Sequence, residues 1–357
     1  MSLVQVLCFI QISKTMNKKE VLLTGVTGFL GSHTAIELLN GGYKVTGTLR
    51  DMKRANAIKA VISEHTHNIE NLDFIEADLL NKEVWIKACS GKDYVIHVAS
   101  PFPRELPKNE DELIIPAKEG TLNVLNAAKI NQVKRVIVVS SISTVVYGKK
   151  IDELSNVFSE KDWTDETNLK DTAPYFRSKT IAEKAAWDFV QKDPQGMELV
   201  TVLPGAMLGP VLEDDFGTSA NIIIKILSGA MPAIPKIGFE IIDVRSVAQL
   251  LISTLENPLA AGNRYIASAG HMSMKEVAMV LKKHFPSRRI KTANLPNVMA
   301  KIFAVFEPAL KPVLLDLGLR RKVDASKAKK QLGWKTYSME ESILSCAKSV
   351  IELGIVK

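Results

Sequence analysis

A tyrosine and a lysine stand four residues apart in the segment Tyr175-Phe176-Arg177-Ser178-Lys179. Four residues are slightly more than one helical turn, so in a helix the phenol and the ammonium project from the same face. A neighbouring ammonium favours the phenolate, and we therefore expect the tyrosine pKa to fall from about 10 toward neutrality. A tyrosine tuned in this way can donate or accept a proton while a carbonyl and an alcohol interconvert.

A glycine-rich segment near the N-terminus could hold a dinucleotide. The apolar run Val21-Leu22-Leu23 precedes its first glycine, and a helical pattern follows over residues 29–39. Glycines at intervals of three permit a tight turn, close approach of a pyrophosphate and close helix–strand packing. The helix N-terminus adds amide donors and partial positive charge. A plain glycine-rich turn is the alternative. We predict cofactor contacts from Thr24, Gly25, Thr27, Gly28, Phe29, Leu30 and Gly31.

The tip of the second predicted strand, Thr48-Leu49-Arg50-Asp51, bears on the choice of cofactor. An acidic residue there would accept both ribose hydroxyls of NAD, whereas an arginine suits the extra phosphate of NADP. Arg50 therefore predicts NADP(H), with Arg54 and Lys53 as further phosphate ligands. A solvated helix start is the alternative for Arg54 and Lys53. Asp51, one position late, keeps NAD(H) as the less favoured cofactor.

Two further strand ends should complete the cofactor site. Asp78-Leu79 could flank the adenine, although Asp78 could equally cap the helix that begins near Asn81. Val98-Ala99-Ser100 leave the fourth strand at the carboxyl edge, where ligands of parallel sheets bind. His97 lies within that strand, and we expect a satisfied core histidine rather than a catalytic one.

Ser140-Ser141 follow another apolar strand, Arg135–Val139. A hydroxyl at that edge can hydrogen-bond both a substrate carbonyl and the tyrosine oxygen. The residues alone do not choose between the two serines, and either could be a simple polar strand end.

The elements that must position these residues alternate between strand and helix from Glu20 onward. We therefore predict an α/β fold with a Rossmann-type doubly wound parallel sheet. Residues 17–204, with about 240–268, should form the NADP-binding domain, the strand at 241–243 and the helix at 244–255 returning to the sheet. Residues 205–239 and 269–357 should form a smaller, mostly helical substrate-binding lobe.

Composition narrows the class of protein. The 357 residues are 46% hydrophobic and 24% charged, as is ordinary for a globular protein. The net charge of +7 arises partly from lysines and arginines at 320–335, where aromatics do not interleave, so a solvated helix face is favoured over nucleic-acid binding. Three widely spaced cysteines indicate no disulfide framework and no metal site, which favours a reducing, cytoplasmic setting.

No stretch is apolar over the length that a membrane span requires. Residues 1–15 carry no charge before Lys14 and lack both the basic start and the small-residue cleavage site of a secretory signal. Met16-Asn17-Lys18-Lys19 is typical of a natural start, so we expect residues 1–15 to be a non-native or flexible extension.

The glycine segment, Ser140-Ser141 and Tyr175-Phe176-Arg177-Ser178-Lys179, in this order, resemble the extended short-chain dehydrogenase/reductase superfamily over nearly all of residues 18–345. Residues 158–165 and 175–187 are similar to the branch of dihydroflavonol 4-reductase, cinnamoyl-CoA reductase and yeast-type ketone/aldehyde reductases. The resemblance implies an NADP-dependent oxidoreductase that is a monomer or a homodimer.

The resemblance also implies a Ser-Tyr-Lys triad. Ser141 takes the serine role, Tyr175 is the general acid in the reductive direction, and Lys179 lowers the tyrosine pKa and holds the nicotinamide ribose. Pro204 and Gly205 match the nicotinamide-side motif of the family. The implied reaction is hydride transfer from NADPH to a small-molecule ketone or aldehyde.

Some positions depart from the plant enzymes. A valine in segment 142–148 replaces the asparagine with which flavonoid reductases bind a polyphenol, so we expect an apolar, small-to-medium substrate instead. Its expected contacts are Phe102, Ser141, Met207 and Phe216, although the apolar three could be ordinary core. The alternatives are a sugar-nucleotide epimerase/dehydratase or 3-beta-hydroxysteroid-type dehydrogenase using NAD, and a non-catalytic NADP-binding sensor. Sensors commonly lose the tyrosine or the lysine, and this chain keeps both.

Overall fold

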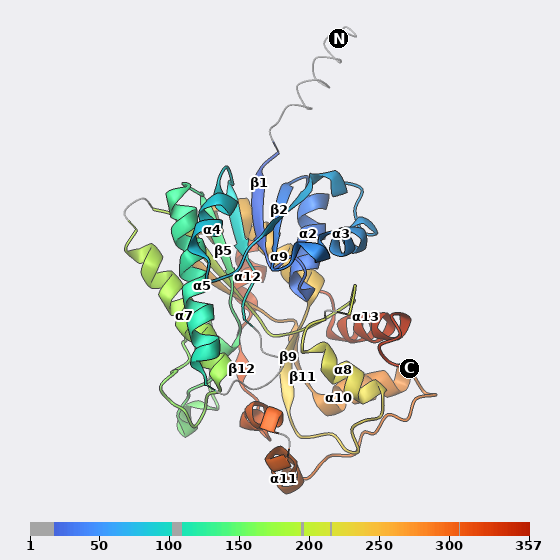
Figure 1. Cartoon of the computed structure of the whole chain (residues 1–357). Coiled ribbons are helices and arrows are strands. Elements are labelled where there is room, and N and C mark those ends of the chain that lie inside the picture. Colours follow the sequence, from blue (N-terminus) through green and yellow to red (C-terminus); the bar gives the residue numbers. More distant parts are fainter. Residues whose placement is uncertain (1–17, 102–108, 194–195, 215, 307) are drawn as a thin grey trace.

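The computed structural model describes residues 18–357 except 102–108, 194–195, 215 and 307 (Figure 1). Residues 1–15 and Phe102 lie outside the described residues. A seven-stranded sheet in which every pair is parallel forms the centre. Its strands, in spatial order, are β10 (Asn263–Ala267), β7 (Glu198–Pro204), β5 (Arg135–Val139), β4 (Tyr94–His97), β1 (Glu20–Thr24), β2 (Lys44–Leu49) and β3 (Leu72–Glu76).

This strand order confirms the predicted Rossmann-type sheet. The chain winds outward from β1 in both directions, so the switch point lies between β1 and β4, and ligands of such sheets bind at the carboxyl ends of these strands. Successive side chains of a strand face opposite sides of a sheet. In β1, accordingly, Val21 and Leu23 join one core cluster and Leu22 joins another. Both faces are buried, which explains why the strands read as apolar runs.

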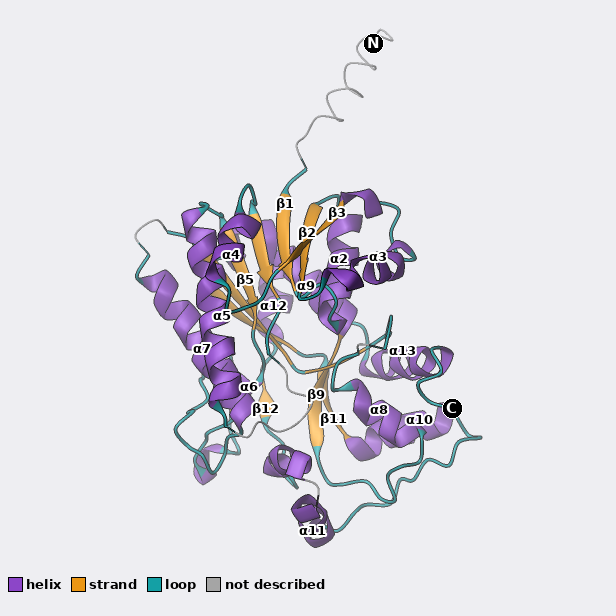
Figure 2. Ribbon diagram, viewed as in Figure 1, coloured by secondary structure: helices purple, strands orange, loops and turns teal. Residues whose placement is uncertain are grey.

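Helices cover both faces of the sheet (Figure 2). One layer contains α2 (Phe29–Asn40), α3 (Ala55–Ser63) and α9 (Val244–Glu256), and the other contains α4 (Lys82–Cys89), α5 (Asp111–Ile130) and α7 (Pro174–Gln191). Helices α5 and α7 pack on each other, as do α2 and α9. The elements predicted between the strands are therefore present, and α9 returns to the main sheet as expected.

The strand before α9 does not return to that sheet. β9 (Gly238–Asp243) pairs in parallel with β8 (Ala206–Leu208) and antiparallel with β11 (Gly270–Ser273), forming a separate three-stranded sheet. The expectation that residues 241–243 join the main sheet is thus wrong. β10 is thus the last strand at this edge of the main sheet, and its Ile266 amide donates to the Glu160 carboxylate at 3.1 Å.

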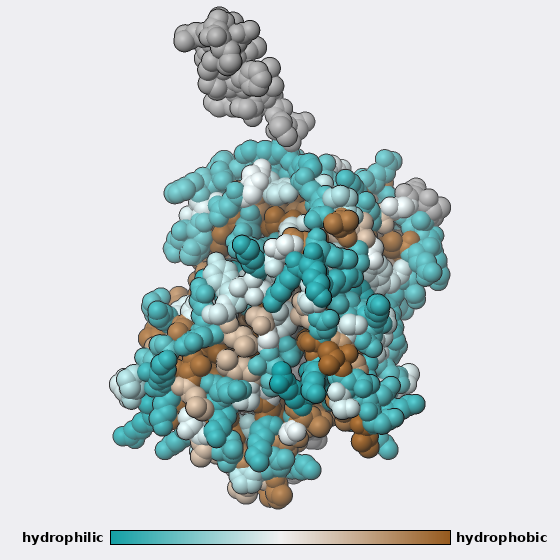
Figure 3. All heavy atoms as spheres, turned by 180° about the vertical axis from the view of Figure 1, so that it is seen from behind, coloured by the Kyte–Doolittle hydropathy of each residue, from teal (hydrophilic) through white to brown (hydrophobic). Residues whose placement is uncertain are grey.

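The smaller sheet is packed by α10 (Met274–His284) and α13 (Met339–Glu352), and α8 (Ala220–Leu227) packs on these two helices. The C-terminal region is mostly helical, as predicted. The other elements are α6 (Ser143–Val146), α11 (Asn297–Phe306), α12 (Ser326–Leu332), the pair β6 (Val157–Phe158) and β12 (Lys322–Val323), and the short helices η1 (Met52–Arg54), η2 (Ile69–Asn71), η3 (Ile151–Glu153), η4 (Pro258–Ala260) and η5 (Pro308–Asp316). Seen from behind, hydrophobic residues form small separate patches among hydrophilic ones (Figure 3). The domain boundaries stay a prediction.

Candidate active site

The loop between β1 and α2 has the geometry that a pyrophosphate needs. Gly25 has φ of 70°, and a Cβ there would lie 3.1 Å from the backbone of Ala99. A Cβ on Gly31 would lie 2.0 Å from the carbonyl oxygen of Gly25, so the helix packs on the turn without space for a side chain. Gly28, the N-cap of α2, has no side-chain cap, which leaves the first amides of the helix available. The loop therefore fits a dinucleotide.

Thr24 connects this loop to the end of β4. Its buried hydroxyl accepts a hydrogen bond from the Ala99 amide at 2.9 Å and lies 2.9 Å from Nδ1 of His97. Because the hydroxyl already accepts from Ala99, we assign its proton to His97, whose Nδ1 then accepts. Burial, assisted by the positive charge of Lys179, lowers the pKa of His97 to about 3. The prediction of a satisfied core histidine is confirmed.

The basic residues predicted for the NADP phosphate lie at the tip of β2. Arg50 is exposed just beyond the strand, while Arg54 pairs with Glu213, with 2.9 Å between Nη2 and each carboxylate oxygen. The Asp51 carboxylate accepts from the Lys53 amide at 2.9 Å and caps η1. The Asp51 carboxylate is therefore occupied by the Lys53 amide, which makes it a weaker candidate for binding the ribose hydroxyls of NAD(H).

The residues predicted near the adenine follow β3. Asp78 is exposed, and its carboxylate accepts from the Leu80 amide at 2.8 Å. Asn81, not Asp78, caps α4, so the alternative role of Asp78 as that cap is wrong. Leu79 is partly buried, as are Val98, Ala99 and Ser100 at the end of β4.

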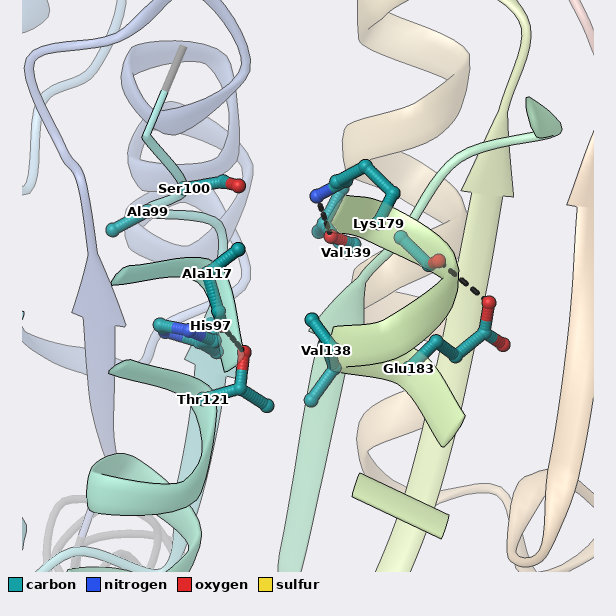
Figure 4. Close-up of a pocket in the computed structure, with 11 residues that line it drawn as sticks. His97, Ala99, Ser100, Ala117, Thr121, Val138, Val139, Lys179 and Glu183 are labelled. Atoms are coloured by element: carbon teal, nitrogen blue, oxygen red, sulfur yellow. Dashed lines mark hydrogen bonds between the residues drawn. The ribbon is translucent and has the colours of Figure 1, made fainter. Parts of the chain in front are cut away.

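Tyr175 and Lys179 stand on one face of α7, which begins with Pro174 in its first turn. Lys179 is buried, and its Nζ donates to the carbonyl oxygen of Val139, the last residue of β5, at 2.9 Å (Figure 4). The side chain of Ser141 is hydrogen-bonded to that of Tyr175. The helix and the strand end thus bring together the three residues predicted for catalysis.

The tandem serines have different partners. Ser140 donates its hydroxyl to a carboxylate oxygen of Glu183 at 2.6 Å, inside the protein. Ser141 bonds with Tyr175, and its Oγ accepts from the Ser143 amide at 3.1 Å. The geometry therefore favours Ser141 as the serine that faces a substrate.

The expected lowering of the Tyr175 pKa is not found. Burial of the hydroxyl raises the pKa of Tyr175 to about 12, and the hydrogen bond with Ser141 offsets only part of that rise, although the ring stays partly exposed. Burial also lowers the pKa of Lys179 to about 8, against the attraction of Glu183. Desolvation of both groups outweighs the effect that their spacing predicted.

The segment after β7 lies beside this site. Pro204 ends the strand, the Gly205 amide donates to the carbonyl oxygen of Ala267 at 3.0 Å, and a Cβ on Gly205 would lie 2.1 Å from the Glu240 carbonyl oxygen. Met207 and Phe216 are partly buried and pack against the main core. Their contact with a substrate stays a prediction.

Comparison with known proteins agrees with this geometry. The model of the NAD dependent epimerase/dehydratase family matches residues 21–267. The chain belongs to this family. The predicted membership of the extended short-chain dehydrogenase/reductases is thereby confirmed.

Curated relatives within this family are reductases. The chain is 33% identical to tetraketide alpha-pyrone reductase 1 of Arabidopsis thaliana over 342 residues, covering 94% of this chain and 97% of that one. It is 34% identical to cinnamoyl-CoA reductase CAD2 of Medicago truncatula over 279 residues, covering 76% and 82%.

Solved structures agree over almost the whole chain. Yeast methylglyoxal/isovaleraldehyde reductase Gre2, crystallised with NADPH, superposes with a TM-score of 0.77 at 26% identity, covering 95% of this chain and 100% of that one. Vestitone reductase from alfalfa (Medicago sativa) superposes with a TM-score of 0.75 at 27% identity, covering 94% and 99%.

One residue of this site, Glu183, was not predicted from the sequence. Glu183 is buried one turn beyond Lys179 and accepts from Arg264, Thr201 and Ser140. Burial would raise the pKa of Glu183, but the charge and hydrogen bonds of Arg264, with those of the hydroxyl groups, lower it overall. Its spacing of four from Lys179 was the available signal.

A small cavity of about 10 Å³ lies behind the lysine. His97, Ser100, Thr121, Ser140, Lys179 and Glu183 supply its polar lining, and Figure 4 shows the side chains of Lys179 and Glu183 on the same helix. A polar cavity of this size has room for one water molecule.

Two kinds of site are absent from the part of the chain that the structure describes. No cluster of three or more histidine, cysteine or acidic side chains there could hold a metal ion. Nor does any described helix combine the length and apolarity of a membrane span.

Proposed function

We propose that the protein is an NADPH-dependent carbonyl reductase that transfers a hydride to a ketone or aldehyde, with Ser141, Tyr175 and Lys179 as its catalytic residues. One observation carries the proposal: Ser141 is hydrogen-bonded to Tyr175, with Lys179 one turn further along α7. A serine, a tyrosine and a lysine so arranged can bind a carbonyl oxygen and protonate it.

The cofactor residues follow from the loop geometry. The amides at the N-terminus of α2 would bind the pyrophosphate, and Gly25 and Gly31 allow its close approach. Arg50 and Arg54 would bind the 2′-phosphate. The NADPH in the crystal structure of Gre2, a structural relative over nearly the whole chain, supports this assignment. When bound, NADPH supplies the hydride.

The side chains would act on the substrate oxygen. The hydroxyl groups of Ser141 and Tyr175 hold that oxygen, and Tyr175 gives it the phenolic proton. A pKa of about 12 keeps Tyr175 protonated at neutral pH, which is the form that a general acid requires. Lys179, fixed by the Val139 carbonyl, would hold the nicotinamide ribose through its remaining N–H groups.

The substrate should be apolar and of small to medium size. Met207 and Phe216 would contribute apolar walls. The missing side chain of Gly205 lets its backbone lie close to Glu240 in β9. The relative Gre2 is named for two small carbonyl compounds, methylglyoxal and isovaleraldehyde, which supports this class.

The test combines purified protein, NADPH and a panel of aldehydes and ketones, with the absorbance of the reduced nicotinamide as readout. We expect its loss with at least one apolar carbonyl compound. Tyr175→Phe should reduce the rate by roughly 10²-fold or more while NADPH binding survives. Tightly bound NAD without net redox change would indicate an epimerase. Cofactor binding without any turnover would indicate a sensor.

A further inference from the structure

Arg54 and Glu213 form an ion pair at the predicted 2′-phosphate end of the cofactor site. Nη2 of Arg54 lies 2.9 Å from each oxygen of the Glu213 carboxylate, and the two side chains are 39% and 21% exposed. Arg54 ends η1 beyond the tip of β2, whereas Glu213 follows β8 and is 159 residues away in the sequence. A guanidinium expected to bind phosphate is thus already held by a carboxylate.

The backbone on both sides of Glu213 is anchored to other elements. On one side, the carbonyl oxygen of Pro210 lies 2.9 Å from Nε2 of His33 in α2, and the Val211 amide donates to Ser349 Oγ in α13 at 2.8 Å. On the other side, Gly217 packs so closely on Phe29 that a Cβ would lie 3.1 Å from the ring. Glu213 therefore lies in a segment that is fixed to α2 and α13, and its carboxylate is held opposite Arg54.

We propose that Glu213 is a specificity-determining residue, which the 2′-phosphate of NADP(H) must displace from Arg54. This rests on the proposed function, because it takes NADP(H) as the cofactor. A phosphate carries more negative charge than a carboxylate and binds guanidinium through paired N–H groups, so it wins the competition. A carboxylate left beside it would repel it, and the side chain has to turn away.

Competition between Glu213 and the cofactor for Arg54 arises with NADP(H) and not with NAD(H). Binding of NADP(H) breaks the Arg54–Glu213 pair, whereas NAD(H) has no 2′-phosphate and leaves the pair in place. Glu213 therefore weakens the binding of NADP(H) and leaves the binding of NAD(H) unchanged. Because the pair is present in the cofactor-free protein and absent from the NADP(H) complex, its effect should be found in the dissociation constant for NADP(H).

The test is Glu213→Gln, with dissociation constants for NADPH and NADH measured by fluorescence titration. Glu213→Gln should bind NADPH roughly 2- to 5-fold more tightly, as expected for loss of a partly exposed ion pair, and should bind NADH as the wild type does. The matched control is Asp214→Asn, which removes the same charge from the exposed neighbouring residue and should alter neither constant. In an Arg54→Met background, Glu213→Gln should have no effect.

Four results would overturn the proposal. Weaker NADPH binding by Glu213→Gln would show that Glu213 holds Arg54 in place for the phosphate. Equal tightening for NADPH and NADH, or equal tightening by Asp214→Asn, would show an effect of net charge. An unchanged NADPH constant in Glu213→Gln would contradict the role of Glu213 while leaving the cofactor assignment intact. A wild type that prefers NADH would instead contradict the proposed function itself.

Discussion

Lys179 Nζ lies 2.9 Å from the carbonyl oxygen of Val139, and this contact fixes helix α7 against the end of strand β5. Ser140 and Ser141 follow Val139 directly, while Tyr175 and Glu183 stand one turn before and one turn after the lysine. Ser140 is hydrogen-bonded to Glu183 and Ser141 to Tyr175, so the two serines contact the same helix on either side of Lys179. The candidate site is thus determined by one helix and one strand end.

The two serines should therefore fail in different ways when replaced. Ser141→Ala removes the partner of Tyr175, and we expect the reductase rate to fall roughly 10²-fold with little change in unfolding free energy. Ser140→Ala removes a donor from the buried Glu183 carboxylate, and we expect a loss of about 1–3 kcal/mol in unfolding free energy. Urea denaturation and steady-state rates on the same preparations measure both effects.

A reversed pattern would contradict this assignment. If Ser140→Ala lost the activity and kept the stability, Ser140 would be the serine that faces the substrate.

The burial of Lys179 should make stability depend on pH in a defined window. The pKa of Lys179 is about 8 in the folded protein, against an ordinary value of 10.5 for a lysine. Between these values the unfolded chain binds more protons, so the contribution of Lys179 to the unfolding free energy rises with pH. The unfolding free energy should therefore be about 3 kcal/mol higher above pH 10.5, where Lys179 is neutral in both states, than below pH 8.

Lys179→Met isolates this contribution. The unfolding free energy of the wild type minus that of the variant, measured from pH 7 to pH 11, should rise through the window. A difference that is flat or falls with pH would mean that the ammonium is not desolvated in the folded protein.

Much of this site could be predicted from local spacing. Tyr175 and Lys179 share a helix face because four residues make about one turn, and the glycines after an apolar strand indicated the cofactor loop. The tandem serines could not be separated, because the residue of α7 that each one meets depends on how the helix is placed against the end of β5. Likewise, β9 pairs with β8 and β11, which are far from it in the sequence, so no local pattern indicated a second sheet.

The remaining misses have the same physical origin. The pKa of Tyr175 was expected to fall because the sequence shows a nearby lysine but does not show how much water the fold removes. Glu213 could not be associated with Arg54, because 159 residues separate them and only the folded chain brings them together.

Arg50 should contribute to cofactor choice independently of Arg54. We expect Arg50→Asp to weaken NADPH binding by roughly 10-fold or more, because a charged hydrogen bond is lost and a repulsive charge is introduced. NADH binding should be preserved or improved, since an acidic residue at this tip can accept from ribose hydroxyls. Lys192→Asp, the same charge change at an exposed residue just after α7, is the comparison and should leave both dissociation constants unchanged. An unchanged ratio of the two dissociation constants would remove Arg50 from the phosphate site.

Two glycines of the cofactor loop allow a test of how closely α2 packs on the turn. Gly31→Ala places a Cβ 2.0 Å from the Gly25 carbonyl oxygen, so the backbone of the loop or the helix must move. We expect a loss of about 3 kcal/mol in unfolding free energy, together with weaker NADPH binding. Gly28→Ala is the matched control, because Gly28 has φ of −83° and its added Cβ would lie 3.5 Å from the same oxygen. Thermal unfolding of both variants, without and with NADPH, measures the two effects. Equal stability of the two variants would show that α2 does not pack on the turn as closely as the structure has it.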